Sequence, residues 1–294
     1  MTLSKQHNLS ATVRRPRRRL PRRTLIWLAT IGLSIVCLVW IYPFIWVLAA
    51  SLKDQMEVFT SGLDLWPRKF VWQNYARAWT DAHFSTYMVN TIVVTVATVV
   101  VVIIRCAMAG YVLARFTFIG HRVVLGILVG TLFVPVGYTI IPVVEVTRQL
   151  GLLNTHAGMI LALSGGGQVA SVLLYMGYFR GIPTEIEEAA KLDGAGFLRT
   201  FLQVMLPLSG PVTATVLVLT VLDTWNAFFL PLVFTFSRPD LRTLSVGMQA
   251  FVGQSSTDWS GMAAAATMSI LPILLLFLVL QRYFFDGIAG AVKS

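Results

Sequence analysis

Residues 82–104 read AHFSTYMVNTIVVTVATVVVVII, and this stretch contains no Asp, Glu, Lys or Arg. It is longer than the roughly 20 residues that a helix needs to cross a hydrocarbon layer of about 30 Å. Apolar and polar residues do not alternate strictly along it, which argues against a strand of a membrane barrel. Because a backbone in lipid must satisfy its own hydrogen bonds, the stretch predicts a membrane-spanning helix.

Five further runs lack charged residues, and each is also long enough to span: 24–52, 123–144, 149–179, 200–222 and 259–281. The whole chain is 56% hydrophobic and 12% charged, whereas soluble domains carry about 25% charged residues. We therefore expect an all-α, polytopic membrane protein with six transmembrane helices. The expected spans are about 25–48, 84–112, 123–143, 157–179, 210–232 and 259–281.

The distribution of Lys and Arg predicts the orientation of these spans. Fifteen of them lie on the side of the two termini and seven on the opposite side, with Arg105 inside a span. Since positive residues mark the cytoplasmic side, both termini are expected in the cytoplasm. The net charge of +10 is then explained by this signal and by anionic lipid headgroups, and the basic tail lacks the interleaved aromatics of a nucleic-acid binder.

The chain divides into four expected regions. Residues 1–23 form a basic cytoplasmic tail, 24–82 the first span and an external loop, 83–283 a five-helix core with a connecting loop at 180–209, and 284–294 a cytoplasmic tail. In the external loop, the spacing of Trp72, Tyr75 and Trp79 predicts a short amphipathic helix. In the third span, Gly126 and Gly130 form a small-xxx-small pattern that favours close helix packing, and Pro135 and Pro142 predict a kink.

No motif for nucleotide, metal or catalysis is present. The run Gly165-Gly166-Gly167 is followed by Gln168-Val169 rather than by the Gly-Lys-Ser/Thr of a phosphate-binding loop. Cys37 and Cys106 lie in separate spans, and four scattered His residues have no ligand spacing. We expect no catalytic residue, no metal and no cofactor bound by this chain.

The loop at 180–209 is the most informative connection. Thr184 and Glu187 have the spacing of a capping box, and Gly194 would allow a left-handed exit from the short helix. A second helix is expected from Phe197 to Leu206, stopped by Pro207. Ala189 and Ala190 expose little apolar area for lipid anchoring, which favours docking into a groove of another protein over resting on headgroups.

Three motifs carry a resemblance to a known family. Glu188-Ala189-Ala190, three residues, Gly194, nine residues, Val204, one residue and Leu206-Pro207 resemble the EAA signature of bacterial ABC importer permeases, with Val204 where Ile is usual. The segments 225–232 and 281–293 resemble the carbohydrate-importing branch, of the maltose-permease (MalG) type. The likeness extends from about residue 25 to the end of the chain.

The resemblance implies a type I (MetI-like) importer permease fold in the bacterial inner membrane, translocating a mono- or oligosaccharide. Its partners would be a second permease subunit, an ABC ATPase dimer that binds ATP and Mg²⁺, and an extracytoplasmic sugar-binding protein. The loop would be the coupling helix, its ATPase interface formed by Glu187, Glu188, Ala189, Ala190, Asp193, Gly194, Leu206 and Pro207.

Asp223, Trp225 and Asn226 are candidates for the substrate pathway, because carboxylates and amides match sugar hydroxyls and aromatic faces stack on sugar rings. The alternative for Asp223 is a buried hydrogen bond between helices. An ion- or proton-driven secondary transporter is the alternative function, but such proteins place several ionisable residues inside their spans, and here only Arg105 and Asp223 lie well within apolar runs. A membrane enzyme is disfavoured because no catalytic arrangement stands at the ends of the spans.

Overall fold

The computed structural model describes residues 22–165, 168–253 and 257–291, and these residues are almost entirely helical. Within them, the only β pairing is an isolated bridge between Val252 and Thr257. Most of the basic tail and the last three residues lie outside the described part. The α-helices are α1 Arg22–Ser51, α2 Gln55–Thr60, α3 Gln73–Thr80, α4 Phe84–Arg115, α5 His121–Thr131, α6 Ile140–Gln149, α7 His156–Gly165, α8 Val169–Gly181, α9 Glu185–Leu192, α10 Phe197–Thr200, α11 Leu206–Leu208, α12 Gly210–Trp225, α13 Phe229–Phe234, α14 Leu244–Gly247 and α15 Trp259–Ala291.

The chain forms two units, residues 1–46 and residues 47–294. The described part of the first unit is most of α1, an apolar helix whose large side chains, such as Leu33, Leu38 and Trp40, are exposed. Exposed apolar side chains all along a helix of this length are those of a segment that lipid covers.

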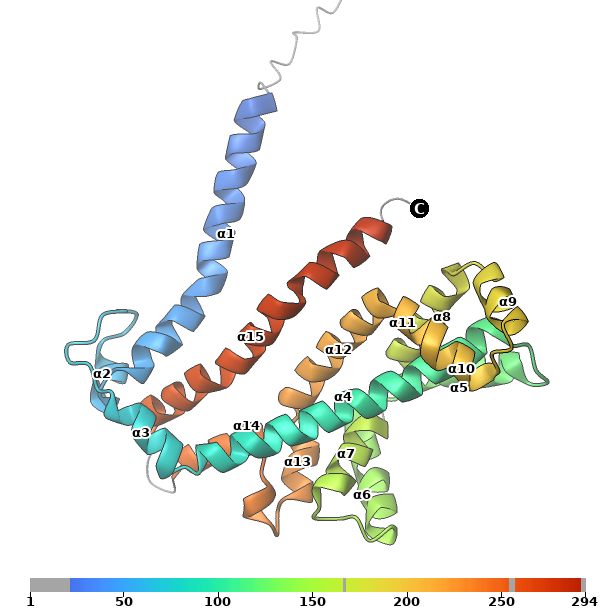
Figure 1. Ribbon diagram of the computed structural model, residues 1–294. Coiled ribbons are helices and arrows are strands. Elements are labelled where there is room, and N and C mark those ends of the chain that lie inside the picture. The colour runs from blue at the N-terminus through green and yellow to red at the C-terminus, as the bar shows by residue number, and fades with distance from the viewer. Residues whose placement is uncertain (1–21, 166–167, 254–256, 292–294) are drawn as a thin grey trace, which may run out of the picture. The chain divides into compact units, whose positions relative to one another are not determined.

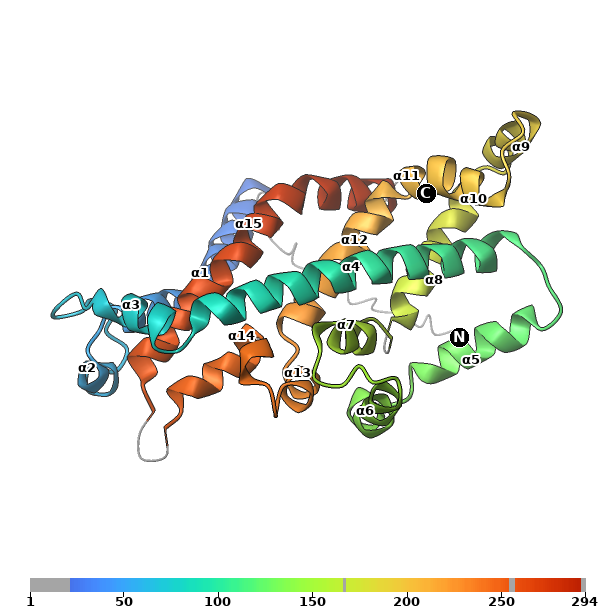
Figure 2. The same cartoon turned by 60° about the horizontal axis from the view of Figure 1, so that its bottom comes forward.

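In the second unit, α4 is the central element. It is 32 residues long, and α7, α8 and α12 pack against it. Figures 1 and 2 show α3 beyond one end of α4 and α9 beyond the other. The principal core lies toward the α9 end and contains Val102 and Tyr111 of α4, Tyr175 and Phe179 of α8, and Val216 of α12, among others.

The close approach of α4 and α8 depends on a glycine. A Cβ atom on Gly110 would lie 2.5 Å from Tyr175 Cβ and 2.9 Å from the backbone nitrogen of Met176. The spacing of Gly126 and Gly130 in α5 predicts close packing. A Cβ atom added to either glycine would nevertheless have no neighbour within 4 Å outside its own helix backbone in the described chain. The tight contact between α4 and α8 therefore lies at Gly110, whereas the small-xxx-small pattern of α5 makes no such contact within the described residues.

Three helices are long and apolar enough to cross a membrane: Ile26–Ser51, Phe84–Arg115 and Trp259–Val279. Two bent pairs qualify if each counts as one span, namely α7 with α8, bent by 58°, and Phe197–Leu208 with α12, bent by 79°. The expected first, second, fourth and last spans thus coincide with these segments, and α15 continues past residue 283 to Ala291. The structure gives three to five spans, and the count of six stays a prediction.

The expected span over 123–143 is broken near Pro135, where a kink is predicted, and it does not continue as one bent helix. Helix α5 has 11 residues and ends at Thr131, and Pro135 then precedes a 3₁₀ turn at Val136–Thr139. Proline has no N–H and disfavours helical backbone at the residue before it, which favours a break at this point. Eleven residues rise only about 16 Å, which is too short for a span.

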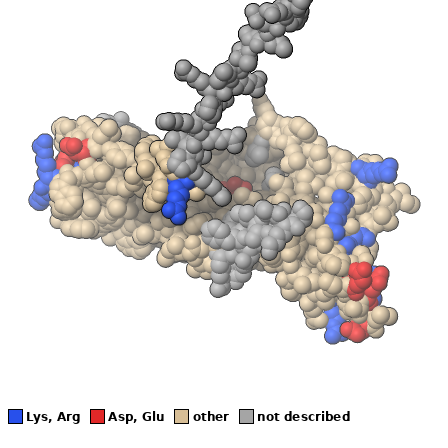
Figure 3. Space-filling model, turned by 90° about the horizontal axis from the view of Figure 1, so that it is seen from above, with Lys and Arg blue, Asp and Glu red and all other residues tan. Residues whose placement is uncertain are grey.

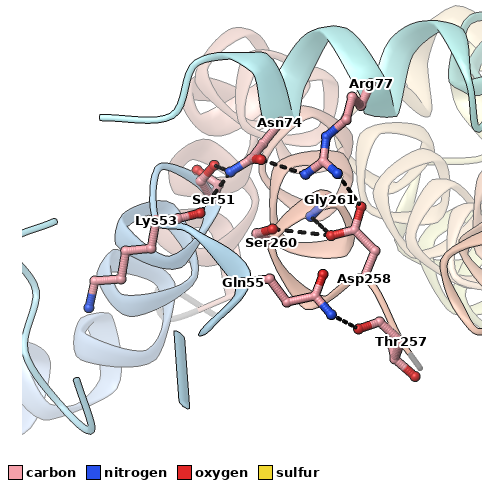
Figure 4. Close-up of polar contacts among 9 residues, drawn as sticks. All are labelled: Ser51, Lys53, Gln55, Asn74, Arg77, Thr257, Asp258, Ser260 and Gly261. Carbon is pink, nitrogen blue, oxygen red and sulfur yellow. Dashed lines mark hydrogen bonds and ion pairs between the residues drawn. The ribbon is translucent and has the colours of Figure 1, made fainter. Parts of the chain in front are cut away.

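The expected short helix of the external loop is present as α3, and its polar contacts fix the start of α15. Figure 4 shows the carboxylate of Asp258 accepting hydrogen bonds from the Gly261 N–H, at 2.9 Å, and from the Ser260 hydroxyl. Arg77 of α3 lies 3.4 Å from the same carboxylate and donates to Asn74, which in turn donates to the carbonyl groups of Ser51 and Lys53. Asp258 thus caps α15 and links it to α3.

Candidate functional site

The loop at 180–209 contains the expected helix, α9, but the expected capping box is wrong. Thr184 has helical backbone angles, φ −69° and ψ −25°, and its side chain makes no capping hydrogen bond. The Glu187 side chain, the other half of the box, is directed to α4 instead. A hydroxyl at this position can reach the free N–H groups only from an extended backbone, which Thr184 does not have.

The exit from α9 is as expected. Gly194 has φ +77°, a left-handed conformation that glycine adopts without strain. Its N–H donates to the Lys191 carbonyl, and the next N–H, of Ala195, donates to the Ala190 carbonyl. These two bonds are those of a Schellman motif, so α9 ends at a fixed turn.

The predicted interface residues of α9 divide between two faces. Glu188, Ala189, Asp193 and Gly194 are exposed, together with Glu185 and with Leu192, which is 89% exposed. Figure 3 shows acidic side chains at the end of the molecule where α9 lies. Glu187 and Ala190, in contrast, are buried against the rest of the chain. An exposed leucine beside a small alanine and two acids forms a surface that nothing in the described chain covers.

Glu187 is held by two residues of α4 that the sequence reasoning did not identify as site residues. Its Oε1 lies 2.5 Å from Nε of Arg115, and its Oε2 accepts a hydrogen bond of 3.1 Å from the Tyr111 hydroxyl. Arg115 also donates from Nη2 to the Ile182 carbonyl at 2.5 Å. In the sequence Arg115 is one of the fifteen positive residues on the side of the termini, and nothing local to it indicates a partner in the distant loop.

Beyond Gly194 the expected stop at Pro207 is wrong. Helix α10 passes into a π turn, Phe201–Met205, and then into α11, which contains Pro207 and ends at Leu208. The wider π turn lies directly before the proline ring, where an α turn would bring a carbonyl against it. Leu206 is half-buried and Pro207 exposed. The chain changes direction at Ser209 instead, by 79°.

Hydroxyl groups join this bend to its neighbours. Ser209 is fully buried, and its Oγ donates to the Leu206 carbonyl at 2.7 Å and lies 3.1 Å from Oγ1 of Thr213. Tyr175 of α8 donates to the same Thr213 oxygen at 2.9 Å, and Tyr178 donates to the Leu208 carbonyl at 3.1 Å. The bend is therefore connected to both α8 and α12.

The three candidate pathway residues also separate. Trp225 is buried in a cluster with Tyr87 of α4 and Leu244 of α14. Asp223, in the last turn of α12, and Asn226, which directly follows the helix, are both exposed; they are three residues apart and thus on one side. Asn226 donates to the Leu222 carbonyl, whereas Asp223 has no hydrogen-bond or ion-pair partner in the described part of the chain. Of the three, only Asp223 and Asn226 are available to a solute.

The expected uninterrupted span at 210–232 contains a break here. Helix α12 ends at Trp225, and α13 begins at Phe229. Arg105, the other ionisable residue inside an apolar run, lines a cavity of about 570 Å³ between α4, α5 and the α7–α8 break, and donates to the Gly165 carbonyl at 3.3 Å. Among the described residues, no group of His, Cys, Asp and Glu is placed to hold a metal ion.

Comparison with known proteins gives the family of the chain. Residues 9–289 match the model of the family described as binding-protein-dependent transport system inner membrane component. A diacetylchitobiose uptake system permease protein of Streptomyces coelicolor is 36% identical over 86% of this chain and 83% of its own length. A melibiose/raffinose/stachyose import permease protein of Bacillus subtilis is 32% identical over 90% of this chain and 96% of its own.

A solved structure supports the same assignment. One chain of a bacterial ABC transporter involved in the import of the acidic polysaccharide alginate superposes with a TM-score of 0.73 and is 27% identical. The match covers 91% of this chain and all of the other. The chain therefore belongs to the family of binding-protein-dependent transport system inner membrane components, and it is a multi-pass permease subunit of an ABC importer rather than an enzyme.

Proposed function

We propose that this permease carries a sugar or oligosaccharide across the bacterial inner membrane, driven by ATP that a separate ATPase dimer hydrolyses with Mg²⁺. A second permease subunit and an extracytoplasmic sugar-binding protein complete the machine. The names of its relatives, which include uptake systems for diacetylchitobiose and for melibiose, raffinose and stachyose, support the substrate class. The distribution of Lys and Arg supports a cytoplasmic location for both termini.

The observation that carries the proposal is the exposed face of α9. Glu185, Glu188, Ala189 and Leu192 recur at helical spacing, and all four are exposed. Ala189 allows close approach of a groove wall, Leu192 offers an apolar anchor, and the two acids suit basic or N–H groups of an ATPase. Asp193 and Gly194 continue this surface, while Glu187 and Ala190 support it from below. Leu206 and Pro207 lie farther along, next to the bend at Ser209.

The test is Ala189→Trp in a membrane preparation that contains all subunits. The indole should obstruct docking, so the ATPase should no longer co-purify with the permease in detergent, and sugar uptake should be lost. Ala76→Trp is the matched control, because Ala76 is an exposed helical alanine of α3, at the opposite end of α4. Its ATPase content should equal that of the wild type.

Retention of the ATPase and full uptake by Ala189→Trp would contradict the docking role of α9. Uptake by the purified permease alone, without ATPase subunits, would contradict the ATP-driven mechanism and favour an ion- or proton-driven carrier.

A further inference from the structure

The buried cluster of Tyr111, Arg115 and Glu187, here called the α4–α9 joint, brings three elements to one point. Arg115 and Tyr111 lie four residues apart on the last turns of α4, Glu187 belongs to the first turn of α9, and the Ile182 carbonyl follows the end of α8. The side chains of Arg115 and Glu187 are 9% and 7% exposed. Oε1 of Glu187 forms an ion pair with Arg115, and Oε2 accepts a hydrogen bond from the Tyr111 hydroxyl.

Aromatic packing attaches the segment that follows Gly194 to the same part of α4. The Tyr111 ring lies 5.6 Å, centroid to centroid, from Phe197 and from Phe201, and at the same distance from Phe179 of α8. The chain is thus attached to α4 both before and after Gly194, by Glu187 on one side and by the two phenylalanines on the other. The exposed face of α9 projects between these attachments.

A buried ion pair resists displacement for an electrostatic reason. Moving α9 along α4 would separate Glu187 from Arg115 and leave two largely buried charges without partners, which is strongly unfavourable. A pair of hydrophobic residues would tolerate a small shift, because apolar contact has little directionality. The joint therefore favours movement of α9 together with the inner end of α4 over sliding between them.

We propose that Arg115 and Glu187 are positioning residues for energy coupling: they make α9 and the inner ends of α4 and α8 one body, so that a displacement of α9 by the ATPase moves these spans. This proposal rests on the docking of α9 described above. It assigns a function to two residues of which one, Arg115, lies outside the coupling loop, and it predicts a defect that differs from loss of docking.

The experiment uses the complete transporter, with ATPase and sugar-binding protein, in proteoliposomes. Glu187→Gln keeps the shape and the Tyr111 hydrogen bond but removes the charge that pairs with Arg115. The ATPase should still co-purify, since the exposed face of α9 is unchanged. The amount of solute transported per ATP hydrolysed should fall roughly tenfold, a size typical of residues that transmit coupling between sites.

Two further variants keep the test decisive if Glu187→Gln does not reach the membrane. Arg115→Lys retains the positive charge, but one ammonium group cannot reproduce the fork that contacts both Glu187 and Ile182, so the transport-to-hydrolysis ratio should again fall. The double variant Arg115→Glu with Glu187→Arg restores opposite charges. Its transport-to-hydrolysis ratio should be higher than that of Arg115→Glu alone or of Glu187→Arg alone.

The matched control is Glu145→Gln, which removes an ion pair of the same kind, with Arg148, from an exposed site on α6. Its ratio should equal that of the wild type. A wild-type ratio in Glu187→Gln, or in Arg115→Lys when the former is not inserted, overturns the joint. If Ala189→Trp also keeps its ATPase and transports normally, the docking proposal falls as well, so the two failures can be told apart.

Discussion

Gly110 sets the distance between α4 and α8, because any larger residue there would overlap the Tyr175 side chain and the Met176 backbone. Gly110→Ala should separate the two helices and cost about 1–3 kcal/mol, the usual penalty of overpacking. Gly126→Ala is the control, because it is also helical but has open space around it, so its thermal stability in detergent should be equal or higher. Equal melting temperatures for both variants would show that α4 and α8 accommodate a methyl group at position 110 without a loss of stability.

For single residues, the sequence predicts those features that depend on the neighbouring residues in the chain. The left-handed backbone of Gly194 follows from an Asp-Gly pair after a short helix, and it is confirmed. The partner of Glu187 could not be predicted, because Tyr111 precedes it by 76 residues and a local capping motif offered a competing role for the same side chain. The residue type alone makes Trp225 a pathway candidate, and only the packing reveals that it is buried.

Helix α12 carries one carboxylate on an otherwise apolar exposed side, with Leu219 and Leu222 as neighbours. A charge that faces lipid at the centre of a span costs about 2.5–3.5 kcal/mol. Since α12 belongs to a candidate span, Asp223 is expected to face water or a partner subunit. Asp223→Leu should therefore impair uptake, with a higher KM for the sugar if the carboxylate contacts it. Leu219→Ala should leave KM unchanged. If Asp223→Leu transports with wild-type kinetics, the residue has no part in the pathway.

Among the elements, long uninterrupted apolar helices were predictable and their breaks were not. A run without charges marks where lipid can cover the chain, and α1, α4 and α15 fulfil that expectation. The run 123–144 continues past the end of α5 at Thr131, because a break in a helix needs no charged residue.

For the whole molecule, the arrangement of inner and outer ends gives a direct test of orientation. With Cys37 and Cys106 replaced, Leu192→Cys should react with a membrane-impermeant maleimide in inverted vesicles and not in intact cells. Trp66→Cys, in the external loop and 79% exposed, should show the reverse. Labelling of Leu192→Cys from outside would place α9 on the wrong side for any cytoplasmic partner.

The family could be predicted from short motifs, whereas the assembly around this chain could not, and the coupling role of the loop at 180–209 stays a prediction. Asp223, Asn226 and the outer face of α9 are exposed because their surroundings belong to other chains or to solvent. Those contacts cannot be predicted from the sequence of one subunit, except that the residue types suit them.

The 79° bend at Ser209 has a geometric consequence for transport. Because α12 stands almost at a right angle to the segment Phe197–Leu208, turning that segment about its own axis sweeps α12 through an arc instead of spinning it in place. The 16 residues of α12 extend about 24 Å, so each ~10° of such a turn carries the far end, near Asp223, sideways by about 4 Å. A modest twist of Phe197–Leu208 is thereby enough to displace Asp223 by the diameter of a hydroxyl group or more.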